Sequence, residues 1–386
     1  MASQDQGNRH RILVVVRWPV GGIRTFIRYV YTNFDRGKYD FVLIAPDGPE
    51  LRVLLNDLHD LKVTYIPVPG WLGLKEFMNT IAATIFREKF DLIHSHGLTS
   101  GMCSAIPARL KGIPHLLTLH DVFTEKQVEG VSGRMKLFAI SLILPLADAI
   151  HSVSFDAQDN LLEYIPILRL FPRKLYAIPN GIQTSRFMAS ERRDLKKELG
   201  LDDSAFLIGF LGRFMSQKGF RYLIDALHLL KTEYTSAKRP VVITFGEGDY
   251  IREEQEMVRK RGLDQDVYFL PFTSNVASSI KGIDVVVMPS LWEACGLLAM
   301  EAMVSGTPLI GTDCIGLREV MKGTPAISVP MRDGKALAQA IYKEMACSSK
   351  EKFIDFQKEA AARFDVVRQS EAIEKLMNRL LRTDST

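Results

Sequence analysis

The sequence has few of the residues that make disulfides or structural metal sites. Its 386 residues include four cysteines, Cys103, Cys295, Cys314 and Cys347. They are far apart, none belongs to a C-x-x-C pair, and no cysteine–histidine group has the spacing of a zinc site. We therefore expect four reduced thiols, which is the usual state of cysteine in a cytosolic protein.

Long apolar segments are also lacking. The longest nearly apolar run, residues 137–147, is interrupted by Ser141 and Pro145, and a spanning helix needs about 18 residues. We interpret this run as a buried helix, with a helix at the membrane surface as the alternative. The N-terminal residues are polar and lack the apolar core of a signal peptide, so we expect a cytoplasmic protein.

An excess of one charge is the third feature that is missing. Forty-nine lysines and arginines oppose 45 acidic residues, which gives a net charge of +4. A dedicated nucleic-acid-binding protein would have a strong basic stripe. The weak positive charge is compatible with an anionic small ligand or with light contact to the inner membrane surface.

Short apolar runs recur along the chain and alternate with stretches long enough for helices. Residues 11–16 form the first such run, and the alternation restarts at residues 206–213 after a turn signal at Pro179-Asn180-Gly181. Buried runs of this kind are typical of parallel strands. The pattern predicts an α/β protein of two parallel-sheet domains, with ligands bound beyond the carboxyl ends of the strands.

Two loops after predicted strands are candidates for phosphate binding. Gly21 and Gly22 follow the first strand and precede a helix, but the full G-x-G-x-x-G dinucleotide motif is absent. Arg213 and Lys218 follow the strand at 206 and are spaced to clamp a diphosphate between them. The alternatives are a purely structural glycine turn and a solvated loop with unrelated charges.

The strongest pattern lies in residues 289–313. Glu293 and Glu301 flank an apolar segment that contains Gly296. If a helix begins there, the amides of Gly296, Leu297 and Leu298 point at a phosphate, and Glu301 accepts hydrogen bonds from vicinal hydroxyls. The alternative is that Glu301 faces solvent on an ordinary helix.

Two histidines end strands of the first half. His96 closes the run DLIHSHG and His120 closes LLTLHD. Polar residues at the carboxyl edge of a parallel sheet are candidates for a binding site, although either histidine alone is also compatible with a structural role.

These motifs occur in the order found in glycosyltransferase family 4, which the sequence resembles over residues 11–382. The resemblance rests on GG at 21–22, DLIHSHG, TLHD, IPNGI at 178, FLGRF and QKGF at 210–220, FGEGD at 245 and PSLWEACGLLAMEAMVSGTP at 289. It implies the GT-B fold, in which two tandem Rossmann-like parallel-sheet domains face a cleft. The implied parts are an acceptor-binding domain (1–182), a donor-binding domain (183–364) and a C-terminal helix (365–386) that crosses back.

The resemblance also implies the roles of individual residues. Glu301 binds the donor ribose, Glu293 lies near the transferred sugar, and Arg213 and Lys218 bind the diphosphate. His120 contacts the donor sugar, so we predict that His120, Glu293, Arg213 and Lys218 act in catalysis. The wider predicted donor site is Gly21, Gly22, Arg213, Lys218, Glu293, Cys295, Gly296, Leu297, Leu298 and Glu301.

The sequence departs from the family pattern at three positions. Gln183 stands where the family usually has aspartate, Gln217 where glutamate is common, and Ala294-Cys295 where Gly-Phe is common. The last change replaces a bulky aromatic residue beside the predicted sugar pocket with a thiol, so it bears on which sugar is transferred.

The resulting hypothesis is a retaining glycosyltransferase of the hexosyltransferase type that moves a sugar from a UDP- or GDP-sugar. We expect no cofactor and no metal, because no D-x-D motif falls near these residues. The expected acceptor is a hydroxyl of a glycan, a lipid-linked or a small molecule, and the expected pathway is polysaccharide or glycolipid synthesis. Two alternatives are a non-catalytic nucleotide-sugar-binding protein and a sugar-nucleotide epimerase.

Clues to the acceptor come only from the first half. We place His96 and Arg24 on the acceptor side. A loop with Trp71, together with a basic face formed by Arg24 and Arg28, is compatible with peripheral contact to the inner membrane. A packed loop and a solvated helix face are the alternative.

Overall fold

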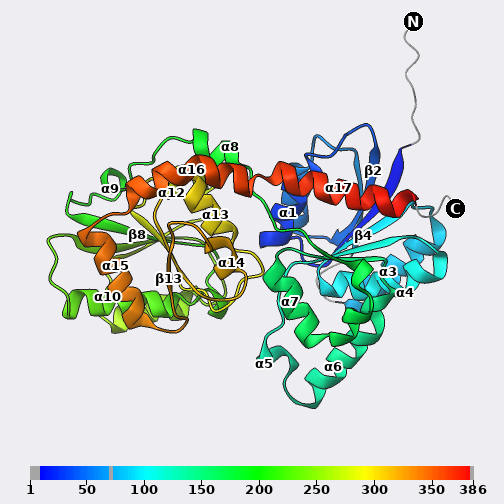
Figure 1. The fold of residues 1–386 in the computed structure, drawn as a ribbon, viewed down its shortest axis with the longest axis horizontal. Coiled ribbons are helices and arrows are strands. Elements are labelled where there is room, and N and C mark those ends of the chain that lie inside the picture. The colour runs from blue at the N-terminus through cyan, green and yellow to red at the C-terminus, as the bar shows by residue number, and fades with distance from the viewer. Residues whose placement is uncertain (1–8, 69–72, 383–386) are drawn as a thin grey trace, which may run out of the picture. The chain divides into compact units, whose positions relative to one another are not determined.

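The computed structural model describes residues 9–68 and 73–382, so Trp71 lies outside the described residues. The chain divides into two compact units (Figure 1). The first contains residues 1–180 together with 366–386, and the second contains residues 181–365. No helix within the described ranges is long and apolar enough to cross a membrane.

The first unit is built on a seven-stranded parallel sheet in the order β3-β2-β1-β4-β5-β6-β7. Its strands are β1 (His10–Val16), β2 (Tyr39–Pro46), β3 (Val63–Val68), β4 (Leu92–His96), β5 (His115–Leu119), β6 (Ala149–Ser152) and β7 (Leu175–Ala177). Its helices are α1 (Gly21–Tyr31), α2 (Pro49–Asp57), α3 (Leu74–Arg87), α4 (Leu98–Lys111), α5 (Glu125–Val128), α6 (Gly130–Ile143), α7 (Phe155–Tyr164) and α17 (Val366–Arg382).

The order of this sheet reverses between β1 and β4. The strand register pairs Val16 with His96 and His96 with Thr118, so β1, β4 and β5 end at the same edge. In open parallel sheets the crevice at such a reversal is the usual place for a ligand. The fold therefore brings the loop after β1 next to the ends of β4 and β5.

The second unit repeats this plan with six parallel strands in the order β10-β9-β8-β11-β12-β13. Its strands are β8 (Ala205–Leu211), β9 (Arg239–Phe245), β10 (Val267–Leu270), β11 (Val285–Met288), β12 (Leu309–Thr312) and β13 (Ile327–Val329). Its helices are α8 (Thr184–Ala189), α9 (Leu195–Glu198), α10 (Phe220–Thr232), α11 (Ile251–Lys260), α12 (Val276–Lys281), α13 (Leu297–Val304), α14 (Leu317–Met321), α15 (Gly334–Ala346) and α16 (Lys350–Phe364). The reversal lies between β8 and β11, the strands that precede the two predicted donor-binding segments.

Apolar residues on alternate positions of the strands pack against the helices. Phe206, Ile208 and Phe210 of β8 share one core cluster with apolar residues of α10 and α15. These side chains are between 0% and 3% exposed, which is typical of a sheet covered by helices. The α/β fold with two parallel sheets, as predicted from the apolar runs, is confirmed.

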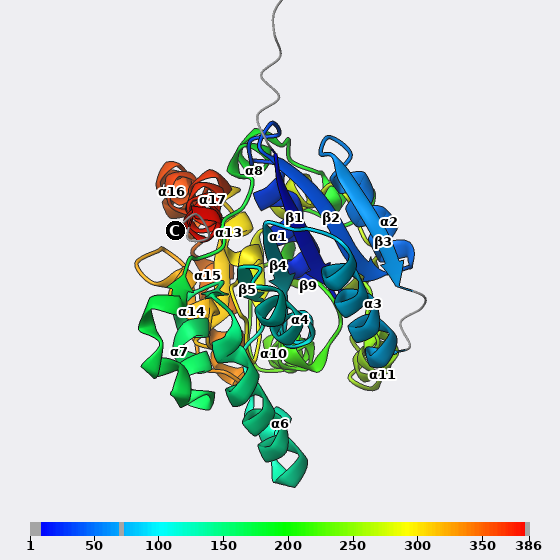
Figure 2. The ribbon, with the colours of Figure 1, turned by 90° about the vertical axis from the view of Figure 1, so that its right-hand side faces the viewer.

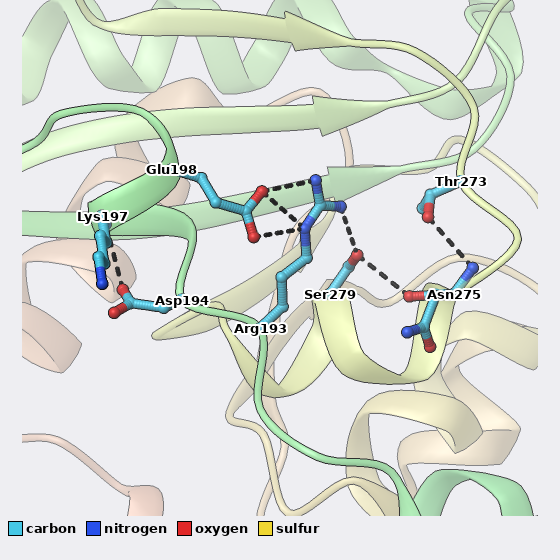
Figure 3. A network of polar contacts seen from close by, with 7 residues as sticks. All are labelled: Arg193, Asp194, Lys197, Glu198, Thr273, Asn275 and Ser279. Carbon is cyan, nitrogen blue, oxygen red and sulfur yellow. Dashed lines mark hydrogen bonds and ion pairs between the residues drawn. The ribbon is translucent and has the colours of Figure 1, made fainter.

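The chain entering the second unit is held by a polar network around Arg193 (Figure 3). Its guanidinium donates three hydrogen bonds of 2.8–3.0 Å to Glu198 and one of 3.2 Å to Ser279 on α12. Ser279 in turn donates to the backbone oxygen of Asn275. Arg193 thereby joins the segment before α9 to α12.

The C-terminal helix α17 belongs to the first unit, where it packs on α1. Tyr39 donates hydrogen bonds to Glu374 (3.2 Å) and Asn378 (3.0 Å) of this helix. These contacts attach the last helix to the first residue of β2.

One prediction about helices is wrong in part. The run at 137–147 does form the second half of α6 and a following short 3-10 helix, residues 144–146. However, α6 is not a buried helix, because Phe138 is 67% and Leu142 58% exposed. An apolar run records hydrophobicity but not whether another element covers it.

Candidate functional site

The second unit brings Lys218 and Glu293 into direct contact. Lys218 ends a short 3-10 turn after β8, and Glu293 lies in the loop after β11. The lysine Nζ donates to Glu293 Oε1 at 2.7 Å, and Ser290 Oγ donates to the same oxygen at 2.8 Å. The carboxylate is buried, whereas the lysine is about one quarter exposed. One end of this ion pair therefore remains open to a ligand.

Close backbone contacts hold the loop of Lys218 and the loop of Glu293 together. Gly219 has φ +66°, a conformation that favours glycine, and a Cβ on it would lie 2.0 Å from the Pro289 carbonyl oxygen. The amide of Leu291 donates to the Gln217 carbonyl at 2.8 Å, and the Gln217 side chain donates to the Trp292 carbonyl. Glycine at 219 is therefore required both by its φ and by its neighbour.

Arg213 and Glu301 are not part of the Lys218–Glu293 ion pair. Arg213 follows β8 and is exposed, and Glu301 lies on α13 and is half-buried. Glu301 is thus neither buried in an apolar core nor fully solvated. Cys295 is buried in the loop before α13, and Cys314 is buried just after β12. Burial raises the pKa of Cys314 to about 12.

The predicted set of phosphate-binding amides is reduced by one. Helix α13 begins at Leu297 with Gly296 before it, as the sequence suggested. The Leu297 amide, however, donates to the Cys295 carbonyl at 2.9 Å. It is not directed outward in this structure, because the chain turns tightly at Gly296, so the candidates are the amides of Gly296 and Leu298.

In the first unit the glycine loop leaves open space. Gly21 has φ +54°, both glycines are exposed, and a Cβ on Gly22 would meet no atom within 4 Å. Packing within the unit therefore does not require glycine at 22. Space without neighbours at the start of a helix suits the approach of a ligand.

Arg24 does not present a free charge beside this loop. Its Nε lies 3.8 Å from Asp57 Oδ2, and Arg28 Nη1 lies 3.9 Å from Oδ1 of the same carboxylate. The basic face predicted for α1 is partly neutralised by a residue of α2, which the sequence pattern of α1 alone could not show.

His96 and His120 do come together at the edge of the first sheet. His96 Nδ1 lies 3.1 Å from His120 Nε2, and both rings pack against Phe26 of α1, at 5.4 and 4.9 Å between centroids. Burial lowers the pKa of His120 to about 3 and that of His96 well below its usual range. Both imidazoles are therefore neutral at pH 7.

Sequence reasoning missed four residues that continue this cluster: Tyr31, His94, Thr118 and His151. Tyr31 OH lies 2.9 Å from His96 Nε2 and 2.7 Å from His94 Nδ1. Thr118 Oγ1 lies 2.8 Å from His94 Nε2 and 3.1 Å from His151 Nδ1. The accumulation of histidines before residue 152 was the only signal in the sequence. Within the described residues, no group of three acidic, cysteine or histidine side chains is arranged to hold a metal ion.

Comparison with known proteins shows similarity along both units. A profile described as "Glycosyltransferase Family 4" matches residues 20–186, and one described as "Glycosyl transferases group 1" matches residues 205–346. The chain is 28% identical over 359 residues to 2-deoxystreptamine N-acetyl-D-glucosaminyltransferase of Streptomyces fradiae, covering 84% of each protein. It is also 28% identical over 295 residues to UDP-Gal:alpha-D-GlcNAc-diphosphoundecaprenol alpha-1,3-galactosyltransferase of Escherichia coli, covering 72% of this chain and 74% of the relative.

Solved structures show the same fold at lower identity. HepE of Anabaena, in complex with UDP-glucose, is 20% identical and superposes with a TM-score of 0.80 over 96% of this chain and 100% of its own. Sucrose-phosphate synthase of Thermosynechococcus elongatus is 18% identical, with a TM-score of 0.77 over 97% of this chain and 100% of its own.

Proposed function

Since the chain belongs to the family 4-type glycosyltransferases of the GT-B fold, we propose that it transfers a sugar with retention of the anomeric configuration. The donor is a nucleotide diphosphate sugar, and the acceptor is a hydroxyl of a glycan, a lipid-linked or a small molecule. UDP-sugars are the first donors to test, because UDP-Gal stands in the name of the E. coli relative and the Anabaena protein was solved with UDP-glucose. GDP-sugars are the second.

The Lys218–Glu293 pair at 2.7 Å is the observation that carries this proposal. A lysine ammonium has three donors, so it can keep one on Glu293 and offer the others to the leaving diphosphate. Negative charge grows on that diphosphate as the anomeric bond breaks, and a fixed cation stabilises it. Arg213, exposed on the same loop, adds a second cation.

The remaining roles extend the proposal to the other named residues. Glu301 accepts hydrogen bonds from the ribose hydroxyls, the Gly296 and Leu298 amides face the phosphates, and Cys295 lines the sugar pocket. In the first unit, the open loop at Gly21 and Gly22 serves the phosphate and acceptor side. We assign His120 to the reacting sugar and His96 to its support.

Three finer points belong to the same proposal. The reaction needs no divalent metal and no cofactor, because the positive charge comes from Arg213 and Lys218. The protein works in the cytoplasm, with peripheral contact to the inner membrane face. Its product enters the synthesis of cell-surface polysaccharide or glycolipid, in keeping with the lipid-linked substrate named for the E. coli relative.

The decisive experiment measures transfer and hydrolysis of labelled UDP- and GDP-sugars, each with and without EDTA. Lys218→Ala and Glu301→Ala should each abolish turnover while the protein stays folded. The matched control is Lys231→Ala, because Lys231 also pairs with a buried carboxylate of this unit, Asp266, but on α10 rather than in the loop after β8. Equal turnover in Lys218→Ala and Lys231→Ala would overturn the assignment, and loss of turnover in EDTA would overturn metal independence.

A further inference from the structure

Helix α6 exposes an apolar stripe along its whole length. Val131, Met135, Phe138 and Leu142 are 76%, 68%, 67% and 58% exposed. Their spacing of four, three and four residues places them within about 60° of arc on one face of the helix. The helix extends away from the sheet of its unit (Figure 2). Exposed apolar surface concentrated in this way marks an interaction site.

The charged side chains of α6 itself have one sign, whereas its exposed N-cap residue, Glu129, is acidic. Arg134 and Lys136 are both exposed, and they are the only ionisable residues of α6. No acidic residue occurs from Gly130 to Ala147. At about 100° per residue, Arg134 borders the stripe, and Lys136 lies about 100° around the helix from its nearest member. A helix with large apolar side chains on one face and only cations among its own charges is complementary to a bilayer surface that carries anionic head groups.

We propose that α6 docks the first unit on an anionic lipid surface, with Met135 and Phe138 inserted among the head groups. This step rests on the proposed membrane contact and gives it a location. A second copy of the chain fits less well, because a symmetric pair of α6 helices would bring two sets of cations together, and α6 itself has no carboxylate to compensate them.

Sedimentation with vesicles tests this proposal. The full-length protein should bind vesicles of equal parts phosphatidylcholine and phosphatidylglycerol, and should bind phosphatidylcholine vesicles much more weakly. Met135→Gln with Phe138→Gln should abolish binding, and Arg134→Gln with Lys136→Gln should weaken it to the level of the neutral vesicles. Because all four side chains are exposed, the melting temperature should not change.

The matched control is Phe272→Gln, which removes a phenylalanine of similar exposure, 64%, from the second unit. It should bind vesicles as well as the wild type. Equal loss in this control, or no binding by the wild type at low salt, would overturn the proposal. So would a dimer in sedimentation equilibrium that Phe138→Gln dissociates. Nucleotide-sugar hydrolysis without vesicles stays intact in the α6 variants, so a failure here is separate from a failure of the proposed activity.

Independently of α6, four histidines of the first unit belong to one continuous chain of hydrogen bonds, from which the buried His115 is separate. In order, it joins His120, His96, Tyr31, His94, Thr118, His151 and the carbonyl oxygen of Ile178, with links of 3.1, 2.9, 2.7, 2.8, 3.1 and 2.9 Å. Every link joins side chains of adjacent strands or of α1, except the last, which reaches the backbone after β7.

The last link fixes the direction of all the others. A carbonyl oxygen only accepts, so His151 Nε2 carries a proton and its Nδ1 accepts from the Thr118 hydroxyl. Thr118 then accepts from His94 Nε2, and His94 Nδ1 accepts from the Tyr31 hydroxyl. Tyr31 accepts from His96 Nε2, and His96 Nδ1 accepts from His120 Nε2. This reasoning holds for neutral rings, and burial lowers the pKa of all four histidines.

We infer that this chain holds His120 in the tautomer with its proton on Nε2, so that Nδ1 presents a lone pair. In the described structure Nδ1 makes no hydrogen bond, so it is the ring atom left to accept one from a substrate hydroxyl. Tyr31 and Thr118 are positioning residues that act through His96. The inference rests on the proposed role of His120 in transfer.

The chain does not conduct a proton. Reversing it would leave the His151 Nε2 lone pair facing the Ile178 carbonyl, with two acceptors opposed and neither satisfied. Its effect is therefore to select one tautomer rather than to carry charge away from the site. A comparable orienting role belongs to the carboxylate of a serine-protease triad.

Histidine-selective ¹⁵N NMR of the full chain tests this directly, with His120→Gln identifying the His120 signals. The wild type should show a protonated Nε2 and an unprotonated Nδ1 at pH 7. Tyr31→Phe removes the central link and should give a mixture of tautomers and a fall in kcat of about ten- to a hundredfold, with KM for the donor almost unchanged. Thr118→Val should behave in the same way, and Thr118→Ser should restore both readouts.

Ser95→Ala is the matched control, because Ser95 is equally buried on β4 but bonds His115, outside the chain. It should leave the His120 tautomer and kcat unchanged. A wild type protonated on Nδ1, or a Tyr31→Phe variant with wild-type tautomer and kcat, would overturn the inference. The NMR readout needs no donor, so it stands even where no transfer is found.

Discussion

Lys218 and Glu293 are 75 residues apart in the sequence and form an ion pair in which only the cation is accessible. The carboxylate accepts from Lys218 and from Ser290, both below 3 Å, and its side chain is 8% exposed, against 27% for the lysine. A buried carboxylate with two donors is a fixed feature of the loop after β11. Because the lysine that it orients is partly exposed, the remaining donors of its ammonium group can reach solvent.

We expect Lys218→Met to affect folding as well as turnover. It leaves the buried Glu293 carboxylate without its cation, which should cost about 2 kcal/mol of unfolding free energy. Adding Glu293→Gln should recover most of that loss, because a neutral amide still accepts from Ser290, but it should not recover transfer. Urea unfolding and a donor assay on the two variants measure both effects. If adding Glu293→Gln lowers the free energy of unfolding further instead of restoring it, Lys218 and Glu293 are not coupled.

Gly219→Ala should open the contact between the two donor loops. Its Cβ would lie 2.0 Å from the Pro289 carbonyl oxygen at φ +66°, so one of the loops must move. We expect a loss of about 3 kcal/mol and a weaker thermal shift with UDP. Gly262→Ala is the matched control, since φ is +65° there but no atom lies within 4 Å of the added Cβ; it should cost only about 1 kcal/mol.

The sequence was sufficient for the fold and insufficient for pairings between distant residues. Buried parallel strands appear as apolar runs, such as residues 11–16, and their alternation with helices limits the topology. No local pattern reveals that Asp57 neutralises Arg24, or that Lys218 pairs with Glu293. Both depend on where another segment lies after folding.

The histidine cluster and α6 are two further cases in which the sequence pattern does not reveal the contacts of a residue. His94 and His151 look like ordinary strand residues, and their bonds to Thr118 depend on the register of β4, β5 and β6. In α6, the apolar run suggested burial, but no element covers Phe138 in the described structure. Periodicity indicates which residues share a face and not what lies against that face.

Thiol labelling should separate the four cysteines in the native protein. Cys347 is exposed, whereas Cys103, Cys295 and Cys314 are buried. Burial raises the pKa of Cys103 to about 11 and that of Cys314 to about 12, and the thiolate is the reactive form. Iodoacetamide at pH 8 should therefore modify Cys347 alone, as read by peptide mass spectrometry, and all four in urea. Early modification of Cys314 would contradict the described burial.

The free energy of unfolding should decrease as the pH is lowered, because of the buried histidines of the first unit. Burial lowers the pKa of His115 and His151 to about 4 and of His120 to about 3, from 6.5. Below pH 6.5 the unfolded chain therefore binds more protons than the folded one, and linkage then makes unfolding easier. The stabilisation present above pH 6.5 is lost progressively between pH 6.5 and about 4, by several kcal/mol in total.

Thermal unfolding followed at pH 8, 6 and 5 measures this loss, and hydrogen exchange assigns it to the first unit. His115→Asn removes one titrating ring without touching the chain that ends at His120, so its melting temperature should fall less steeply between pH 6.5 and 5 than that of the wild type. His228→Asn is the control, because His228 lies in the second unit on α10, and its slope should match the wild type. Parallel slopes for all three proteins would show that buried histidines do not cause the acid sensitivity.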